Sequence, residues 1–294
     1  MLDWIDIKQY GFDYYLTFKR SKVLITPLEA AHYTIKYITD KYPPPYTLML
    51  SGGIDSQAML YAWHTSGIPF KTFSAVYNHK LNQHDLVALE QFAAVHNISI
   101  SYKDFDLLNF LFTEHESYVH SYRCGSPHMT TFMKISEQID SGTVVMSGNI
   151  IPPRRPTLPV TKNNFALYRY AKENNRSIVP FFFLETDQIA CSFDQYVEDD
   201  ISQPNSEDLH PIYRVRVNLY HRGGFPVIPQ EQKFTGFEEV KNYFDENYKH
   251  LVTLQDKLSI TREQNSRRTF DQLFRNKYEI KYASDKYEIR VHHA

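Results

Sequence analysis

Cysteine is scarce in this sequence, whose 294 residues contain only Cys124 and Cys191, far apart. Neither belongs to a C-x-x-C pair, which argues against a zinc ribbon and against a disulfide scaffold. Two isolated cysteines are typical of a protein kept in a reducing compartment, so we expect a cytoplasmic location. The first residues lack a basic segment followed by an apolar core, and this predicts no signal peptide.

Long apolar runs and net charge are lacking as well. No run approaches the roughly 20 residues that a membrane-spanning helix needs, so no membrane partner is expected. The 32 Lys and Arg nearly balance the 34 Asp and Glu. No overall field therefore recruits nucleic acid, although a local basic patch stays open. A Walker loop, G-x-x-x-x-G-K followed by Ser or Thr, is also missing.

The sequence does contain a strand, a glycine turn and a helix start in direct succession, within residues 46–61. An apolar run at residues 48–50 predicts a buried strand, and it is followed by Ser51-Gly-Gly. Apolar residues at helical spacing begin at Ile54. In this geometry free backbone N–H groups and the positive end of a helix meet at an anion.

The residue types of this loop suit a phosphate. Gly52 and Gly53 allow positive φ and let a phosphate approach the main chain without meeting a Cβ atom. Ser51 and Ser56 add hydroxyl donors, and Asp55 supplies a carboxylate for a magnesium ion held against the phosphates. The predicted nucleotide-binding loop is Ser51, Gly52, Gly53, Ile54, Asp55 and Ser56.

The run from Ser51 to Ser56 resembles the S-G-G-x-D-S signature of the PP-loop ATP pyrophosphatases. That superfamily includes the asparagine, GMP and NAD synthetases and several tRNA-modifying enzymes. The resemblance implies cleavage of ATP between the α- and β-phosphates, with an adenylated substrate and released pyrophosphate. It also implies ATP and Mg²⁺ as cofactors and Asp55 as the metal ligand. Within the superfamily, the sequence most resembles an asparagine-synthetase-like adenylating domain, because two cysteines cannot build the zinc or iron–sulfur sites of other branches.

Strand-like and helix-like segments alternate after the loop. Strands are expected at 70–77, 98–102 and 143–147, and helices at 84–96 and 129–139. The alternation predicts an α/β fold, a parallel sheet with helices on both faces, of the adenine nucleotide alpha hydrolase-like kind that the resemblance implies. Ligands of such sheets bind at the carboxyl ends of the strands, where Ser51, Tyr77 and Ser147 fall.

The resemblance extends, with decreasing sharpness, over residues 46–149. In the superfamily the strand after the loop helix lies beside the adenine, which main-chain groups read. This implies a binding role for Ala75 and Tyr77. A later strand that ends in a small residue and a glycine lies across from the loop, which implies a binding role for Ser147 and Gly148.

The loop carries no cation, yet charge on a leaving pyrophosphate calls for one. Lys233 precedes an expected helix start and resembles the lysine that several amide-forming members place late in the chain. Arg154 and Arg155 follow a strand end and can reach the same cleft. We therefore predict Asp55, Lys233, Arg154 and Arg155 as catalytic residues. The alternatives are a solvated lysine and an Arg pair that binds an acidic partner or a nucleic acid.

Three regions are predicted along the chain. Residues 1–45 form a hairpin and a helix, residues 46–200 form the ATP-binding domain, and residues 201–294 form an α+β extension that completes the cleft. The N-terminal hairpin is expected to pair residues 14–18 with 23–26.

Two further motifs concern the ends of helices. Thr26 and Glu29 have capping-box spacing and predict a helix that starts at Pro27, and Thr235 and Glu238 predict another. In the extension we also expect a strand at 213–220, a helical segment at 271–275 and a closing hairpin at 278–291.

The acceptor substrate stays open. A small-molecule or peptide carboxylate and a tRNA or DNA base all suit adenylation, with a separate nitrogen-donating subunit as a further partner. Cys124 is an option for sulfur transfer, although no Lys or His adjoins it. A different class of function is a catalytically reduced nucleotide- or nucleic-acid-binding module with the same fold. The presence of Ser51, Asp55 and Ser56 together favours catalysis, because binding alone tolerates the loss of Asp55.

Overall fold

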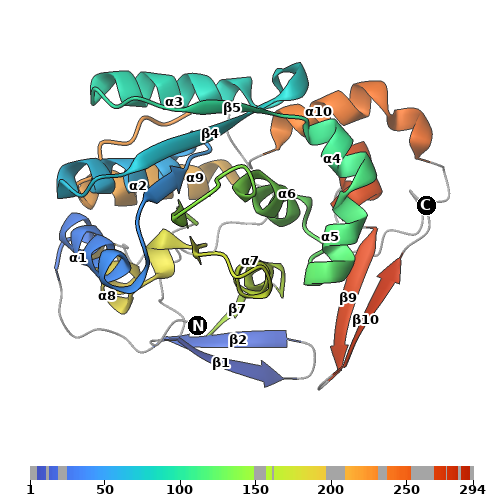
Figure 1. Ribbon diagram of the computed structural model, residues 1–294, viewed down its shortest axis with the longest axis horizontal. Helices are drawn as coiled ribbons and strands as arrows, with labels where there is room; N and C mark the ends of the chain where they lie inside the picture. Colours follow the sequence, from blue (N-terminus) through green and yellow to red (C-terminus); the bar gives the residue numbers. More distant parts are fainter. Residues whose placement is uncertain are drawn as a thin grey trace.

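A five-stranded parallel sheet forms the centre of the computed structural model (Figure 1). The structure describes residues 5–10, 13–18, 25–148, 157–160, 162–196, 209–230, 237–252, 268–275, 277–283 and 286–291. The strands lie in the order β5-β4-β3-β6-β8, and every pair is parallel. Their bounds are β3 Tyr46–Met49, β4 Lys71–Tyr77, β5 Tyr102–Phe105, β6 Thr143–Met146 and β8 Ile178–Val179.

Helices cover both faces of this sheet, because successive strand residues point to opposite sides. Leu48 and Val145 belong to a core with α1, α2, α3, α8 and α9, whereas Met49 and Val144 belong to a core with α4, α5, α6 and α7. The first group is α1 Pro27–Lys41, α2 Ile54–Ser66, α3 Gln83–Val95, α8 Asp187–Ser192 and α9 Leu209–Arg222. The second group is α4 Leu107–Thr113, α5 His115–Tyr122, α6 Pro127–Ser136 and α7 Lys162–Glu173. The predicted fold class is confirmed.

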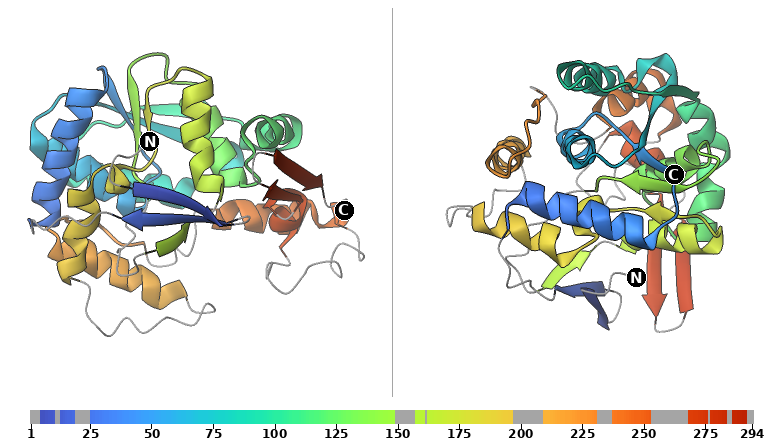
Figure 2. Two further views of the ribbon diagram at one scale, coloured as in Figure 1. Left: turned by 90° about the horizontal axis from the view of Figure 1, so that it is seen from below. Right: turned by 60° about the vertical axis from the view of Figure 1, so that its left-hand side comes forward.

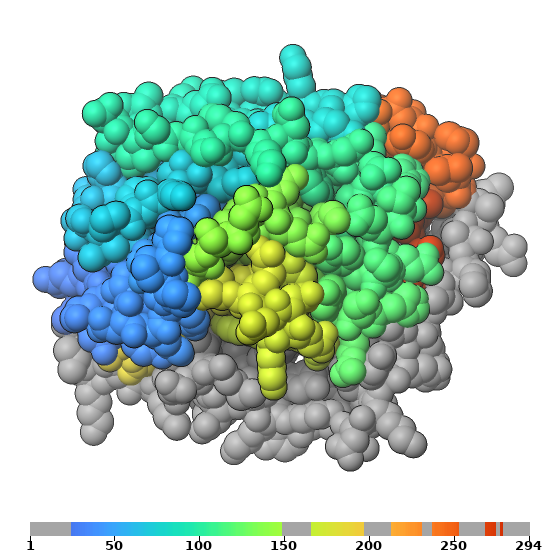
Figure 3. All heavy atoms as spheres, viewed as in Figure 1, coloured from blue at the N-terminus to red at the C-terminus, as the bar shows by residue number. Residues whose placement is uncertain are grey.

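Outer surfaces follow from this layering. Figure 3 shows the side chains of α7 between those of α1 and α5 on one face of the molecule. Among the described residues, no helix combines the length and the apolar content needed to cross a bilayer.

The start of α1 forms as predicted. Thr26 accepts a hydrogen bond from the Glu29 N–H, the Glu29 carboxylate accepts one from the Thr26 N–H, and Pro27 takes the first turn. This capping box satisfies two backbone donors that a helix start leaves open. Helix α1 contacts α2 and α8 and shares their core, so it packs directly on the sheet layer.

The N-terminal hairpin uses other strands than predicted. Strand β2, Asp13–Phe18, pairs antiparallel with β1, Ile5–Tyr10, and on its other side with β7, Thr157–Val160. Pairing of β2 with residues 23–26 was therefore a wrong prediction. The physical reason lies partly in Thr26, whose extended backbone and side chain cap α1 and are not available to a strand.

Residues 213–220 are helical, which corrects the predicted strand. They lie within α9, and Tyr213, Val217 and Tyr220 recur on one helical face. The alternation of Arg214 and Arg216 with valines has a period of two and suggested a strand. The larger aromatic residues follow the helical period instead, and burial of Tyr220 decides the outcome.

The C-terminal region packs on the second core. Helix α10, Glu238–Asn247, and the helical turn Asp271–Arg275 bury Phe244 and Phe274 there. Helix α10 follows Phe237, and Thr235 lies outside the described residues. The predicted closing hairpin is confirmed as β9, Tyr278–Ala283, paired antiparallel with β10, Lys286–Val291 (Figure 2).

Candidate functional site

A cavity of about 220 Å³ opens at the carboxyl ends of β3, β4 and β6. The structure brings together there seven of the predicted binding residues from three separate segments of the chain. They are Ser51, Asp55, Ser56, Ala75, Tyr77, Ser147 and Gly148. The remaining three, Gly52, Gly53 and Ile54, form the turn between them without lining the cavity.

The glycine turn is set by a close backbone approach. Gly52 has φ +85°, and a Cβ atom there would overlap the carbonyl oxygen of Asp85 on α3. Only glycine therefore suits this position. Gly53 occupies the position that normally caps a helix, and no side chain caps α2. The first-turn N–H groups of α2 are thus left for another acceptor, as an anion-binding helix start requires.

The two loop serines bond to each other across the turn. The Ser56 hydroxyl accepts a hydrogen bond from the Ser51 N–H at 3.1 Å, and the two hydroxyl oxygens are 3.0 Å apart. Ser56 is almost fully buried. It therefore shapes the loop, and Ser51 is the more exposed hydroxyl at the cavity.

At the end of β4, the Asn82 side chain bridges the two residues expected to contact a base. Its amide nitrogen donates to the Ala75 carbonyl at 2.8 Å, and its amide oxygen accepts from the Tyr77 N–H at 2.9 Å. Asn82 stands at the cap position of α3 yet makes no capping hydrogen bond. It stabilises the strand end instead, and the Tyr77 N–H is already occupied.

The structure adds two residues to Asp55 that the sequence did not single out. Arg216 and Tyr220 lie one turn apart on α9, which runs beside α2 (Figure 2). One guanidinium nitrogen of Arg216 donates to both carboxylate oxygens, and the Tyr220 hydroxyl donates to one of them at 2.6 Å. Both charged side chains are largely buried, with 17% of Asp55 and 25% of Arg216 exposed.

The charge of Asp55 keeps this group of residues polarised. Burial is the largest single influence on Arg216 and lowers its pKa, but the Asp55 charge, the Tyr220 hydroxyl and the hydrogen bonds to both together outweigh it, so the pKa is raised. Burial, and then the Asp55 charge, raise the pKa of Tyr220 well above its ordinary value. Arg216 therefore stays a cation and Tyr220 a neutral donor. Had residues 209–222 been predicted as a helix, Arg216 and Tyr220 would have been recognised on one face of it.

The segment after α9 is held against the loop by buried amides. The Gln57 side chain, fully buried, accepts from the Ile228 N–H at 2.7 Å and donates to the Gly52 carbonyl at 3.0 Å. Gln230 donates to the Asp85 carboxylate at 3.0 Å. Through these bonds α9 is fixed relative to the glycine turn, although they join residues 171 and 145 positions apart.

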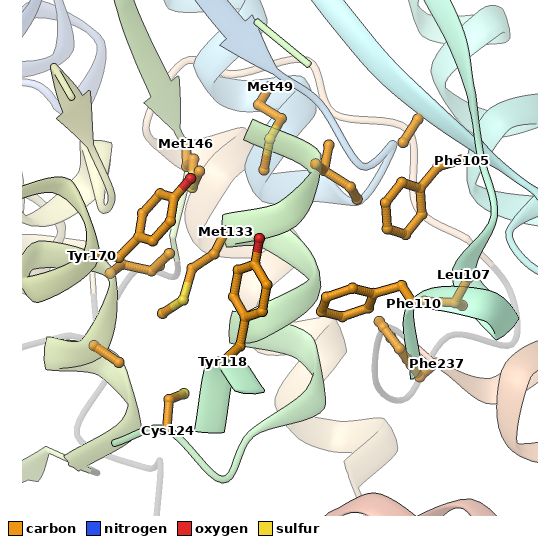
Figure 4. Close-up of a cluster of buried hydrophobic side chains, with 14 of the residues drawn as sticks. Met49, Phe105, Leu107, Phe110, Tyr118, Cys124, Met133, Met146, Tyr170 and Phe237 are labelled. Atoms are coloured by element: carbon orange, nitrogen blue, oxygen red, sulfur yellow. The ribbon is translucent and has the colours of Figure 1, made fainter. Parts of the chain in front are cut away.

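The other half of the cavity is apolar and aromatic. It is formed by α6, by the segment after β8 and by the residue before α10, and its members include Met129, Phe132, Ile135, Phe181, Leu184 and Phe237. Figure 4 shows Met49 and Met146 at the strand ends facing the helix that carries Met133. No lysine or arginine lines the cavity among the described residues, whereas the Asp55 and Asp85 carboxylates do.

Three predicted catalytic residues, Lys233, Arg154 and Arg155, lie outside the described residues and stay predictions. Cys124 is fully buried, its thiol points to the Ser126 carbonyl, and burial raises its pKa to about 12. A buried thiol of this kind is a poor nucleophile, so sulfur transfer by Cys124 is not supported.

Magnesium, which the resemblance implies, fits the donor set at the loop. The Asp55 carboxylate already holds the cationic guanidinium of Arg216, which stands in for a metal charge. No group of three His, Cys, Asp or Glu suited to a metal occurs in the part of the chain that the structure describes. Magnesium commonly takes one or two carboxylates and completes its shell with phosphates and water, so Asp55 and a bound nucleotide would suffice.

The arrangement is typical of parallel α/β proteins that bind a phosphorylated ligand where strands end and a helix begins. Comparisons with known proteins give the following picture. No model of a protein family and no curated protein matches the sequence.

Solved structures of similar arrangement do exist, all of low identity. The U34-tRNA thiolase NcsA from Methanococcus maripaludis is 11% identical over 76% of this chain and 74% of its own, with a TM-score of 0.36. The NMN synthetase from Francisella tularensis is 16% identical over 70% and 99%, with a TM-score of 0.32. The NH3-dependent NAD synthetase from Campylobacter jejuni is 13% identical over 70% and 97%, also with a TM-score of 0.32. These neighbours are members of the PP-loop ATP pyrophosphatase superfamily that the loop signature resembles.

Proposed function

We propose that the protein is an ATP pyrophosphatase of the PP-loop class. It binds ATP with Mg²⁺, transfers the adenylyl group to a carboxylate or carbonyl oxygen and releases pyrophosphate, after which an amine or ammonia attacks. The observation that carries the proposal is the uncapped start of α2, which meets Ser51, Ser56 and Asp55 at one end of the cavity. This is an anion site without a Walker lysine.

The chain's own residues would divide the work as follows. First-turn N–H groups of α2 and the Ser51 hydroxyl bind phosphate oxygens, and Asp55 holds the metal that offsets phosphate charge. The apolar half of the cavity excludes water from the α-phosphorus, which favours transfer to the acceptor over hydrolysis. Adenylation asks mainly for positioning and charge stabilisation, so the scarcity of acid–base groups is in keeping with it.

The lining residues also bear on the acceptor. The described lining includes two carboxylates, of Asp55 and Asp85, and a cluster of aromatic and methionine side chains. Asp55 is paired with Arg216, but the Asp85 carboxylate would repel a free carboxylate acceptor, whereas it would not repel the carbonyl oxygen of a flat, neutral group such as a nucleobase. This favours a nucleobase-modifying reaction. We further propose that the protein acts in the cytoplasm, alone or with a separate nitrogen-donating subunit.

The test is the fate of ATP labelled at the α-phosphate, incubated with Mg²⁺ and candidate acceptors. We expect labelled AMP or an adenylate together with pyrophosphate. Asp55→Asn should lose this turnover, because the amide lacks the charge that holds the metal. Formation of ADP and inorganic phosphate would contradict the proposal.

One observation favours a second candidate, a nucleotide-binding module without turnover. Both oxygens of Asp55 are engaged by Arg216, and Tyr220 adds a further bond, so the metal ligand is occupied by the protein itself. Such a module would bind ATP at equilibrium yet release no pyrophosphate with any acceptor. Measuring binding and product formation on the same sample separates the two functions.

A further inference from the structure

Among the described residues, a cation is already bound to the carboxylate in the loop at residues 51–56 that a metal would need. Arg216 is the cation that the structure brings to Asp55, and it does so from α9, more than 150 residues later in the chain. Its guanidinium is not saturated, because the buried Nε–H has no hydrogen-bond partner among the described residues. An unpaired buried N–H is costly, and a bound ligand would relieve that cost.

The charges around the loop also favour a role for Arg216 in ligand binding. A polyphosphate that enters the cavity meets the carboxylates of Asp55 and Asp85. Asp85 is buried, and its carboxylate accepts a hydrogen bond from the neutral side-chain amide of Gln230. Among the described residues, Arg216 is the cation that neutralises Asp55. When a metal ion takes over Asp55, the guanidinium is left a few atoms from the loop without a counterion, and a phosphate oxygen is the natural replacement.

We propose that Arg216 exchanges partners: it pairs with Asp55 in the free protein and with the nucleotide's phosphates once Mg²⁺ occupies Asp55. This rests on the proposed function for the presence of a nucleotide and a metal. Tyr220 stays on Asp55 and holds the carboxylate in place, because its hydroxyl is neutral and its ring is packed against Phe183 and Phe225. The exchange makes metal and polyphosphate binding interdependent through one side chain.

The experiment measures binding and needs no turnover. Mn²⁺ alone, a spectroscopic substitute for Mg²⁺, and a non-hydrolysable ATP analogue with Mg²⁺ are titrated separately into the parent and into Arg216→Met. Arg216 competes with the metal but supports the phosphates, so the variant should bind Mn²⁺ more tightly and the analogue about tenfold or more weakly. Adenosine, which has no phosphates, should bind parent and variant alike.

Arg214→Met is the matched control, since Arg214 lies on the same helix and is exposed. It removes the same charge and should change neither affinity. Arg216→Lys is the second variant should Arg216→Met fail to fold, and it should bind the analogue with intermediate affinity, because a lysine keeps the charge without the fork.

Two results would overturn the exchange. Unchanged analogue affinity in both Arg216 variants would show that the guanidinium never reaches the phosphates. A parallel fall of Mn²⁺ and analogue affinity would show a purely structural role. A parent that binds the analogue but never releases pyrophosphate from ATP would contradict the proposed catalysis and leave the exchange standing.

Discussion

At the scale of single residues, the ion pair of Asp55 and Arg216 has a measurable energetic signature. Removing one partner of a largely buried pair leaves the other uncompensated, so Asp55→Asn should lower the free energy of unfolding by roughly 2–4 kcal/mol. The double variant with Arg216→Met should cost about 1–3 kcal/mol less than the sum of the two single changes. Urea denaturation of all four proteins checks this. Asp55→Asn combined with Arg214→Met should be additive, and additivity of the Arg216 pair as well would contradict the coupling.

Gly52 provides a second test at this scale. Gly52→Ala should destabilise the fold and abolish nucleotide binding, because its Cβ would overlap the Asp85 carbonyl in addition to the strain of positive φ. Gly67, at the end of α2, has φ +73° and open space around it, so Gly67→Ala should cost only about 1–2 kcal/mol and leave binding intact. Thermal denaturation and nucleotide titration distinguish the two. Equal effects of both substitutions would mean that only φ matters.

The loop residues were predictable because their chemistry is contiguous in sequence, from Ser51 to Ser56. Arg216 was not, because its role depends on a contact between α9 and α2 that no local pattern encodes. Alternating Arg and Val suggested a strand. Only in a helix do Arg216 and Tyr220, four residues apart, lie one turn apart on the same face. Asn82 stands at the cap position of α3, but its side-chain hydrogen bonds go back to β4.

At the scale of elements, His115 joins α5, α6 and the helical turn Asp271–Arg275. Its ring is buried, its Nδ1 lies 2.9 Å from the Thr130 hydroxyl, and it packs edge-on against Phe274 and Tyr278. Burial lowers its pKa from 6.5 to about 4. The unfolded chain therefore binds a proton at higher pH than the folded chain does, and folding is favoured by deprotonation.

This gives a prediction with a defined sign. The contribution of His115 to stability is fully present above pH 6.5 and is lost as the pH falls towards 4, by about 3 kcal/mol in total. His115→Asn, which keeps a short polar group for Thr130, should flatten the pH dependence of the unfolding free energy between pH 4 and 6.5. His64→Asn, at an exposed histidine of α2, should leave it unchanged. Identical pH profiles for His115→Asn and the parent would exclude this role.

Element identity was predictable where hydrophobic period and cap agreed, as in α1, and in α3 the hydrophobic period alone was sufficient. Boundaries were less predictable: β5 begins at Tyr102, where the predicted strand ended, and Ile98 and Ile100 before it are partly buried against the core that contains Leu89 and Phe92 of α3. The prediction of the N-terminal hairpin failed for a related reason, since the position of β2 depends on its long-range pairing with β7 as well as on a local turn.

At the scale of the whole molecule, the parallel order of the sheet was predictable from alternation, but the closure of the site was not. The regions 1–45, 46–200 and 201–294 remain a prediction, although α1 and α9 both share the core of the second region. Arg216, Tyr220 and Ile228, which hydrogen-bond to Asp55 and Gln57, are distant from them in sequence. These contacts cannot be found without the fold.

The hydrogen bonds that Ile228 donates to Gln57 and Tyr220 donates to Asp55 have a consequence for the order of synthesis. A nascent chain that has grown to residue 200 already contains all five strands of the parallel sheet and the complete glycine turn. It still lacks every described partner of the Asp55 side chain. On the ribosome, the loop at residues 51–56 is thus made early, and its Asp55 receives its counterion Arg216 late, when α9 emerges.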